Sequence, residues 1–233
     1  MSLDSAIKTA VGGMIAQGTV LGVTAQNIAN LGTAGYKRGI ATIGSGVSQI
    51  PEVFLRRDTS QGAIAPTGNP NDVAINGPGY FEVALAGGGV AYTRNGQFGL
   101  SANASMVDMN GNPVLGPIQT DPAGGPVSIS KDGVVSQTVN GTTRVLGQIQ
   151  LATFPNAGGL SPENGNLFSQ TDASGQPVTG AIGGQLIQGA IETPNVDLAQ
   201  EMITLITART VYQASARVIG TANTMEKRLL DIV

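Results

Sequence analysis

Apolar residues recur at alternating spacings of four and three near both ends of this chain. The first series consists of Ile7, Val11, Met14, Gly18, Leu21, Ala25 and Ile28. The second series, with three polar interruptions, consists of Leu198, Met202, Leu205, Arg209, Tyr212, Ala216, Ile219, Asn223, Glu226 and Leu230. This spacing is typical of a helix that packs along one stripe against another helix. The pattern therefore predicts one helix over about 3–30 and another over about 198–231.

Both predicted helices need more partners than one short chain supplies. At the helical rise they would be about 40 Å and about 50 Å long, against a radius of gyration of about 17 Å for a compact chain of this size. The second helix also has another apolar line, formed by Ile203, Ile206, Val211, Ala214, Val218, Met225 and Ile232. A helix that is apolar on two sides requires two sets of partners. A single compact bundle is the alternative interpretation, but it would cover only one side.

We therefore expect the terminal helices to pair with each other and with neighbouring subunits, as a coiled-coil-like domain. The expected assembly interface consists of Ile7, Val11, Met14, Leu21 and Ile28 in the first helix, and of Leu198, Met202, Leu205, Tyr212 and Ile219 in the second.

The middle of the chain has the pattern of short strands joined by tight turns. Asx-Gly pairs, a strong hairpin signal, begin at residues 76, 95, 110, 132, 140 and 164, with short apolar or alternating runs between them. The predicted fold is α+β, with a central antiparallel β-rich domain. The expected divisions are an N-terminal helical segment at 1–38, a linker at 39–71 with a short strand near 52–56, the β-rich domain at 72–190, and a C-terminal helical segment at 191–233.

Composition argues against catalysis. The 233 residues include no His, Cys or Trp, and only 12% of them are charged. The commonest general base, the thiolate nucleophile and most zinc or copper ligands are therefore missing. We expect no catalytic residue, no metal, no cofactor and no enzymatic activity. With a net charge of −3 and scattered Lys and Arg, the chain is not expected to bind nucleic acid.

Two local motifs have simple explanations. Residues 87–89 are three glycines followed by a strand pattern, without the Gly-Lys-Ser/Thr ending of a phosphate-binding loop, and a hairpin loop is favoured. Residues 108–112 resemble a calcium loop, but the Gly comes one position too early and no Glu closes the loop, so a turn is favoured. The remaining alternative from another class is a carbohydrate-active enzyme with a carboxylate pair in the β domain.

The end of the first helix carries a recognisable motif. Residues 27–38 resemble the signature of the bacterial flagellar rod and hook axial proteins, an Asn-x-Ala-Asn-x-x-Thr-x-Gly-aromatic-Lys pattern. The matching residues are Asn27, Ala29, Asn30, Thr33, Gly35, Tyr36 and Lys37. Segments 72–81, 92–98, 146–154 and 189–197 are also similar to the family, in the family's order.

This resemblance implies a structural subunit of the flagellar basal-body rod that polymerises helically into the tubular axial shaft through its terminal helices. It implies a homopolymer, with other rod and hook axial proteins, the surrounding basal-body rings, the rod cap and the flagellar type III export apparatus as partners. It also implies an extracytoplasmic location and export without a cleaved signal peptide. Gly35 is expected to turn the chain where no Cβ fits, and Tyr36 to anchor that turn against the C-terminal helix.

The resemblance leaves the position along the axis open. The short chain favours the distal or proximal rod, because a typical hook subunit has an extra outer domain. Residues 195–199 and the turn at 95–98 are closer to hook proteins. A short hook subunit is therefore the alternative within the family.

Overall fold

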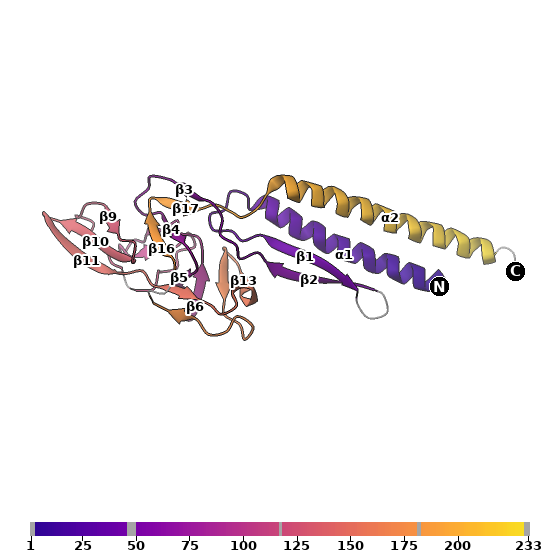
Figure 1. The fold of residues 1–233 in the computed structure, drawn as a ribbon, viewed down its shortest axis with the longest axis horizontal. Coiled ribbons are helices and arrows are strands. Elements are labelled where there is room, and N and C mark those ends of the chain that lie inside the picture. Colours follow the sequence, from indigo (N-terminus) through magenta and orange to yellow (C-terminus); the bar gives the residue numbers. More distant parts are fainter. Residues whose placement is uncertain (1–2, 46–49, 117, 181–182, 231–233) are drawn as a thin grey trace. The chain divides into compact units, whose positions relative to one another are not determined.

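The computed structural model describes residues 3–45, 50–116, 118–180 and 183–230. It confirms the α+β fold, with a long helix near each end of the chain and antiparallel strands between them (Figure 1). The chain forms two compact units, which we call the helical unit and the β unit. The helical unit comprises Met1–Leu31, Arg38–Asp58 and Val196–Val233, and the β unit comprises Gly32–Lys37 and Thr59–Asn195.

The helical unit consists of two helices and a hairpin. Helix α1 spans Leu3–Ala29 and helix α2 spans Leu198–Leu230, close to the predicted bounds. They lie side by side, and the hairpin formed by β1 (Gly39–Ser45) and β2 (Pro51–Arg57) packs along α1 (Figure 1).

The chain is divided differently from the sequence-based boundaries. The predicted linker 39–71 contains the β1–β2 hairpin, which belongs to the helical unit, and then continues into the β unit from Thr59. The hairpin register is regular from Gly39 opposite Arg57 to Ser45 opposite Pro51. Glycines and a proline in this stretch suggested a linker, but its two strands pair along their full length, and the strand expected near 52–56 lies within β2.

An aspartate caps the start of α2. The Asp197 Oδ1 atom accepts hydrogen bonds from the backbone N–H groups of Ala199, at 2.9 Å, and Gln200, at 3.3 Å. These N–H groups have no acceptor within the helix, so the carboxylate supplies one. Its negative charge is also stabilised by the positive end of the helix dipole.

The β unit contains several small antiparallel sheets. Its strands are β3 (Ile64–Pro66), β4 (Val73–Asn76), β5 (Tyr80–Ala84), β6 (Val90–Thr93), β7 (Gly99–Leu100), β8 (Met106–Val107), β9 (Val127–Ile129), β10 (Val134–Val139), β11 (Thr142–Gln148), β12 (Leu151–Thr153), β13 (Ser161–Glu163), β14 (Leu167–Ser169), β15 (Val178–Thr179), β16 (Gln185–Gln188) and β17 (Ala190–Glu192). The largest sheet has the order β13-β14-β6-β5-β12-β15, and a second has the order β11-β10-β9. The pairs β16-β4, β17-β3 and β7-β8 complete the unit.

Asx-Gly pairs predicted some of these connections but not all. The pair at 140–141 forms the two-residue turn between β10 and β11, with positive φ at both residues. The pair at 132–133 joins β9 to β10, and the pair at 164–165 joins β13 to β14. The pair at 76–77 does not close a hairpin, because β4 pairs with β16 from the end of the unit instead of with β5. The three glycines at 87–89 lie in the loop between β5 and β6, as predicted.

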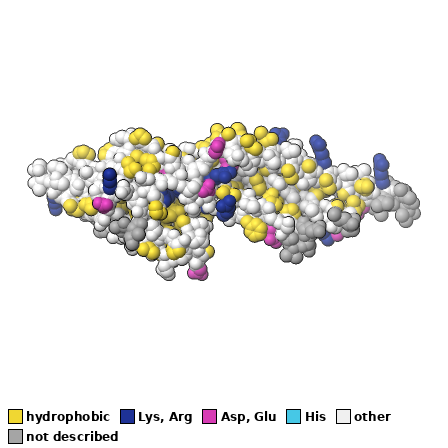
Figure 2. All heavy atoms as spheres, viewed as in Figure 1, with side chains coloured by type: hydrophobic (Ala, Val, Ile, Leu, Met, Phe, Trp, Pro, Cys, Tyr) yellow, Lys and Arg dark blue, Asp and Glu magenta, His cyan; other side chains and the backbone are white. Residues whose placement is uncertain are grey.

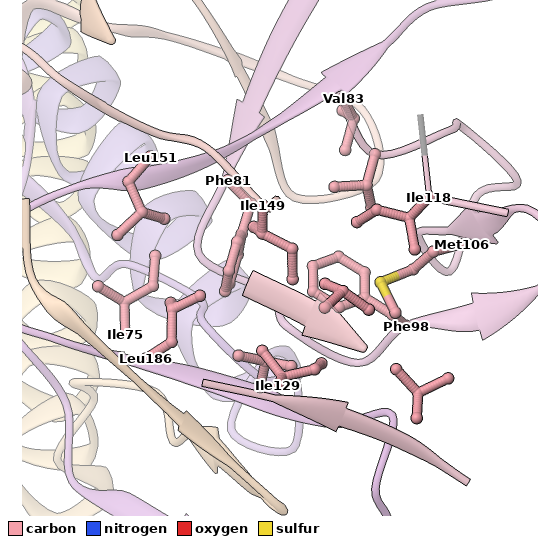
Figure 3. Close-up of a cluster of buried hydrophobic side chains, with 14 of the residues drawn as sticks. Ile75, Phe81, Val83, Phe98, Met106, Ile118, Ile129, Ile149, Leu151 and Leu186 are labelled. Atoms are coloured by element: carbon pink, nitrogen blue, oxygen red, sulfur yellow. The ribbon is translucent and has the colours of Figure 1, made fainter. Parts of the chain in front are cut away.

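The β unit has its own hydrophobic core. Sixteen buried apolar side chains form its main cluster, and they point toward one another from several strands (Figure 3). Phe81 and Phe98 meet edge to face, with ring centroids 4.9 Å apart. A second cluster around Tyr80, Tyr92 and Phe168 lies on the other face of β5 and β6. Burial of these large apolar side chains stabilises the β unit.

Candidate assembly surface

The buried residues of the two helices are mostly small or polar. The residues of α1 that are buried are Ala10, Gly12, Ala16, Val20, Thr24 and Asn27. In the described part of α2, the buried residues are Glu201, Ala208 and Ala222. Such side chains let helix backbones approach closely but remove little apolar surface from water. The pairing of α1 with α2 therefore stabilises the helical unit only modestly.

Large apolar side chains remain exposed along both helices. On α2 they are Leu198, Met202, Ile203, Ile206, Val211, Tyr212, Val218 and Met225, and on α1 they are Val11 and Ile15. Ile206 is 63% exposed and Ile15 is 67% exposed. Figure 2 shows hydrophobic side chains on the visible surface of the helical unit. By length and composition alone, α1 is apolar enough to cross a membrane. Exposed apolar surface of this extent marks an interaction site.

The predicted interface residues border the contact between α1 and α2. Val11, Leu198, Met202 and Tyr212 are exposed. The side chains that are half-buried are Ile7, Met14, Leu21, Ile28, Leu205 and Ile219. The buried residues of α1 are therefore not the predicted ones, and four of them (Ala10, Val20, Thr24 and Asn27) each precede a position of the predicted stripe by one residue. The predicted stripe is therefore left partly free in the single chain, and its role in assembly stays a prediction.

Threonine hydroxyls on α2 are satisfied within the helix. The Oγ1 atoms of five threonines each donate to the carbonyl four residues earlier, at 2.8 to 2.9 Å. These residues are Thr204, Thr207, Thr210, Thr221 and Thr224. Because these hydroxyls already donate a hydrogen bond within the helix, a neighbouring molecule need not supply an acceptor for them.

A neutral groove lies within the helical unit. It has a volume of about 440 Å³ and lies between α1, β1 and α2. Val20, Ile43 and Ile203 supply apolar walls, while Gln17, Gln200 and three threonines supply uncharged polar groups. It is continuous with the exposed apolar side of α2 at Ile203.

The family motif is distributed between the two units. In the helical unit, the Asn27 side chain binds the backbone of Gly39 twice: Oδ1 accepts from its N–H and Nδ2 donates to its carbonyl, both at 2.8 Å. This pair ties the end of α1 to the start of β1. Asn30 donates to the carbonyl of Gln26 and so covers the end of the helix, whereas Ala29 is exposed.

Gly35 behaves as the sequence predicts. Its φ is +67°, and a Cβ placed there would lie 2.3 Å from the backbone carbon of Arg94. Its N–H donates to the carbonyl of Glu192 at 2.7 Å. Thr33 accepts from the N–H of Tyr36, and the Tyr36 side chain is buried. Anchoring of Tyr36 against the C-terminal helix stays a prediction.

Lys37 forms a buried ion pair with Glu192. The Nζ atom lies 2.6 Å from Oε1 of Glu192 and 2.7 Å from the carbonyl oxygen of Ser60. Arg94 adds a second cation, with Nη1 3.1 Å from Oε2 of Glu192. The Arg94 guanidinium also lies 5.2 Å from the ring centroid of Tyr80, and burial raises the pKa of the Tyr80 hydroxyl.

Sequence reasoning identified Lys37 but missed its partners. Glu192 and Arg94 are far from the motif in sequence, and neither stands in a pattern that indicates burial. The same is true of the ion pair in the helical unit between Arg38 Nε and Glu201 Oε1, at 2.5 Å. The available signal was that Arg94 and Glu192 lie in segments 92–98 and 189–197, which resemble the family.

The loop at 108–112 forms a turn, as the sequence favours. Oδ1 of Asp108 accepts from the backbone N–H groups of Asn110 and Asn112, and Oδ2 accepts from their side-chain amides. Four donors thus surround the carboxylate. Among the residues that the structure describes, no group of three or more acidic residues is placed to hold a metal ion.

A helical unit built from both ends of the chain, with apolar side chains exposed along its length, has the features expected of a structural subunit. Family models match this chain in three places. A model described as a flagella basal body rod protein matches residues 7–37, one described as the flagellar hook protein FlgE/F/G D1 domain matches 74–137, and one described as the flagellar basal body rod FlgEFG protein C-terminal matches 187–232.

Relatives match over nearly the whole chain. The flagellar basal-body rod protein FlgG of Buchnera aphidicola subsp. Schizaphis graminum is 34% identical over 250 residues, covering 94% of this chain and 96% of that protein. FlgG of Agrobacterium fabrum is 35% identical, with the same coverage. The flagellar basal-body rod protein FlgF of Caulobacter vibrioides is 34% identical, covering 96% of this chain and 95% of that protein. The chain therefore belongs to the family of flagellar basal-body rod proteins, which confirms the resemblance.

Proposed function

We propose that this chain, a structural subunit of the flagellar basal-body rod, polymerises with other copies of itself into a helical tube through the exposed apolar faces of α1 and α2. The observation that carries this proposal is the exposure of eight large apolar side chains on α2. Only small or polar residues of the described part of α2 are buried. In water this face is unfavourable, and burial between subunits removes the cost.

The proposal includes a location and a set of partners. The basal body is the site of assembly, and other rod and hook axial proteins are the neighbours along the axis. Relatives named FlgG and FlgF support a rod position rather than the hook. The rings, the rod cap and the export apparatus as partners, an extracytoplasmic location, and export without signal cleavage stay predictions from the family resemblance. A purely structural role, without catalysis, completes the proposal.

The test places a charge on the exposed face of α2. Ile206 is 63% exposed, so Ile206→Asp should leave the single chain folded. Within a subunit contact the carboxylate would lose water without gaining a partner, at a cost of several kcal/mol. We expect the critical concentration for polymerisation to rise by about 100-fold or more. Sedimentation and electron microscopy of the purified protein measure this.

Val145→Asp is the matched control, because Val145 is an apolar residue of the β unit that is 71% exposed. It makes the same kind of change outside the proposed interface, and this variant should polymerise nearly normally. Polymers of normal length from Ile206→Asp would contradict the proposed interface. Circular dichroism of both variants separates a loss of assembly from a loss of folding.

A further inference from the structure

Glu192 joins three separate segments of the β unit. Its Oε1 atom accepts from Nζ of Lys37 at 2.6 Å and from the backbone N–H of Gly62 at 2.8 Å. Its Oε2 atom accepts from Nη1 of Arg94 at 3.1 Å, and its carbonyl accepts from the N–H of Gly35 at 2.7 Å. Lys37 and Glu192 are 155 residues apart in sequence. One side chain thus holds together parts of the unit that are distant in the chain.

The Glu192 carboxylate is the shared counter-charge of the two cations that it contacts, Lys37 and Arg94. Lys37 and Glu192 are each 1% exposed, and Arg94 is 5% exposed. Two cations therefore share one anion away from water. Nε of Arg94 already lacks a hydrogen-bond partner among the described residues. Without the Glu192 carboxylate, two buried cations would lose their shared counter-charge, which strongly disfavours the closed arrangement.

The cluster lies where the chain enters and leaves the β unit. Lys37 ends the first segment of the unit, and Ser60 follows the start of the second. The carbonyl of Ser60 accepts from Lys37 Nζ, at 2.7 Å, and from Asn195 Nδ2, at 3.0 Å, so it contacts both ends of the unit. Pairing of β17 with β3, which sets Glu192 opposite Ile64, positions the carboxylate.

The hydrophobic core does not include this first segment. All members of the main core cluster lie between Val73 and Leu186, outside residues 32–37. Docking of 32–37 therefore rests on polar contacts, the buried Tyr36 and the ion cluster, and core formation does not itself require it.

We propose that Glu192 is a latch that holds segment 32–37 on the β unit, so that this link between α1 and β1 docks only after β17 is in place. The core forms first in this scheme, and the link closes when the last strand of the unit brings the carboxylate to Lys37 and Arg94. A chain with an incomplete β17 therefore keeps an undocked link. This device does not depend on the polymerisation proposed above.

Hydrogen exchange of single amides in the full-length monomer tests the latch. In Glu192→Gln, the amides of Gly35 and Tyr36 should exchange about tenfold faster or more, because the link opens locally. The amides of Phe81 and Val83 in the core should keep their wild-type rates. Unchanged exchange at Gly35 and Tyr36 would overturn the proposal. Equal acceleration of exchange at Phe81 and Val83 would also overturn it, because Glu192 would then stabilise the whole β unit and not the link alone.

Two further variants complete the test. Glu163→Gln removes an exposed carboxylate in the same unit and should leave all four amides unchanged. Lys37→Met with Glu192→Gln removes one buried cation together with the anion, which restores the original charge balance and covers the case in which Glu192→Gln fails to fold. In this double variant the core should be protected while Gly35 and Tyr36 still exchange faster than in the wild type. Wild-type rates at Gly35 and Tyr36 there would overturn the latch.

Discussion

Gly35 shows how one residue of the motif is fixed by its surroundings. With φ at +67° and a Cβ position 2.3 Å from the Arg94 backbone, it meets both a conformational and a steric restriction. Gly35→Ala should lower the free energy of unfolding of the β unit by about 3 kcal/mol or more. Urea denaturation followed by β-sheet circular dichroism measures the loss.

Gly68→Ala is the matched control for Gly35→Ala. Gly68 has φ at +74° but nothing within 4 Å of a Cβ, so only the backbone restriction applies. We expect a loss of about 1 to 2 kcal/mol there. Equal losses at the two positions would show that the close approach to Arg94 does not matter.

We expect Glu82 to make the stability of the β unit depend on pH. It is buried on β5 opposite Tyr92, and its Oε1 atom has no hydrogen-bond partner among the described residues. Burial raises the pKa of the Glu82 carboxyl above its ordinary value of 4.5. Between the unfolded and folded pKa values, the folded state binds more protons. The contribution of Glu82 to stability is therefore full below the unfolded pKa and is lost as pH rises toward the folded pKa.

Glu82→Gln should remove this slope. Urea midpoints of the wild type should fall from about pH 4.5 upward, whereas those of Glu82→Gln should change less over the same range. Glu163→Gln, at an exposed position, should keep the wild-type slope. A wild-type slope in Glu82→Gln would show that other groups cause the pH dependence.

Single residues of the site were predictable only where they belong to a motif. Gly35 and Lys37 were identified, and the structure gives Gly35 its expected backbone conformation. Glu192 was not identified, because its burial is produced by strand pairing and by partners more than 90 residues away. A sequence pattern reports which face of a strand is buried but does not report which distant charge will meet it.

At the level of elements, helix α2 buries few of its residues within its own unit. Beyond Ala208, the buried residue in its described part is Ala222, and Gly220 adds a further cost to the helix. We expect amides at 211–228 to exchange within seconds to minutes in the monomer and to be protected by about 100-fold or more in the polymer. Exchange at micromolar concentration, before and after assembly, measures this. Strong protection in the free monomer would contradict it.

Elements were predictable to the extent that their signals are local. Heptad spacing located α1 and α2, and Asx-Gly pairs located the turns between β9, β10 and β11. The strand expected near 52–56 lies within β2, but its pairing with β1 was not predicted, because glycine and proline in this stretch suggested a linker. The pairs β4 with β16 and β3 with β17 join distant segments, and alternation alone does not select their partners.

At the scale of the whole molecule, the two units differ in which side chains they bury. The β unit buries large aromatic and aliphatic side chains within itself, so we expect its fold to be independent of neighbours. The buried residues of α2 are small or polar, and large apolar side chains remain exposed on both helices, so we expect the stability of the helical unit to depend on other chains. A substitution in the β core should therefore act on the single chain, and a substitution on the outer face of α2 should act on the polymer.

The threonine hydroxyls of α2 affect which contacts a neighbouring copy of the chain would have to make in the proposed polymer. Because five hydroxyls already have their acceptors within the helix, the neighbouring chain need not supply a matching polar group at a fixed position. These hydroxyls therefore make few directional demands on a neighbouring helix. In the polymer proposed above, adjacent helices could settle at slightly different offsets without leaving a donor unpaired, so the rod would tolerate neighbours that are similar but not identical.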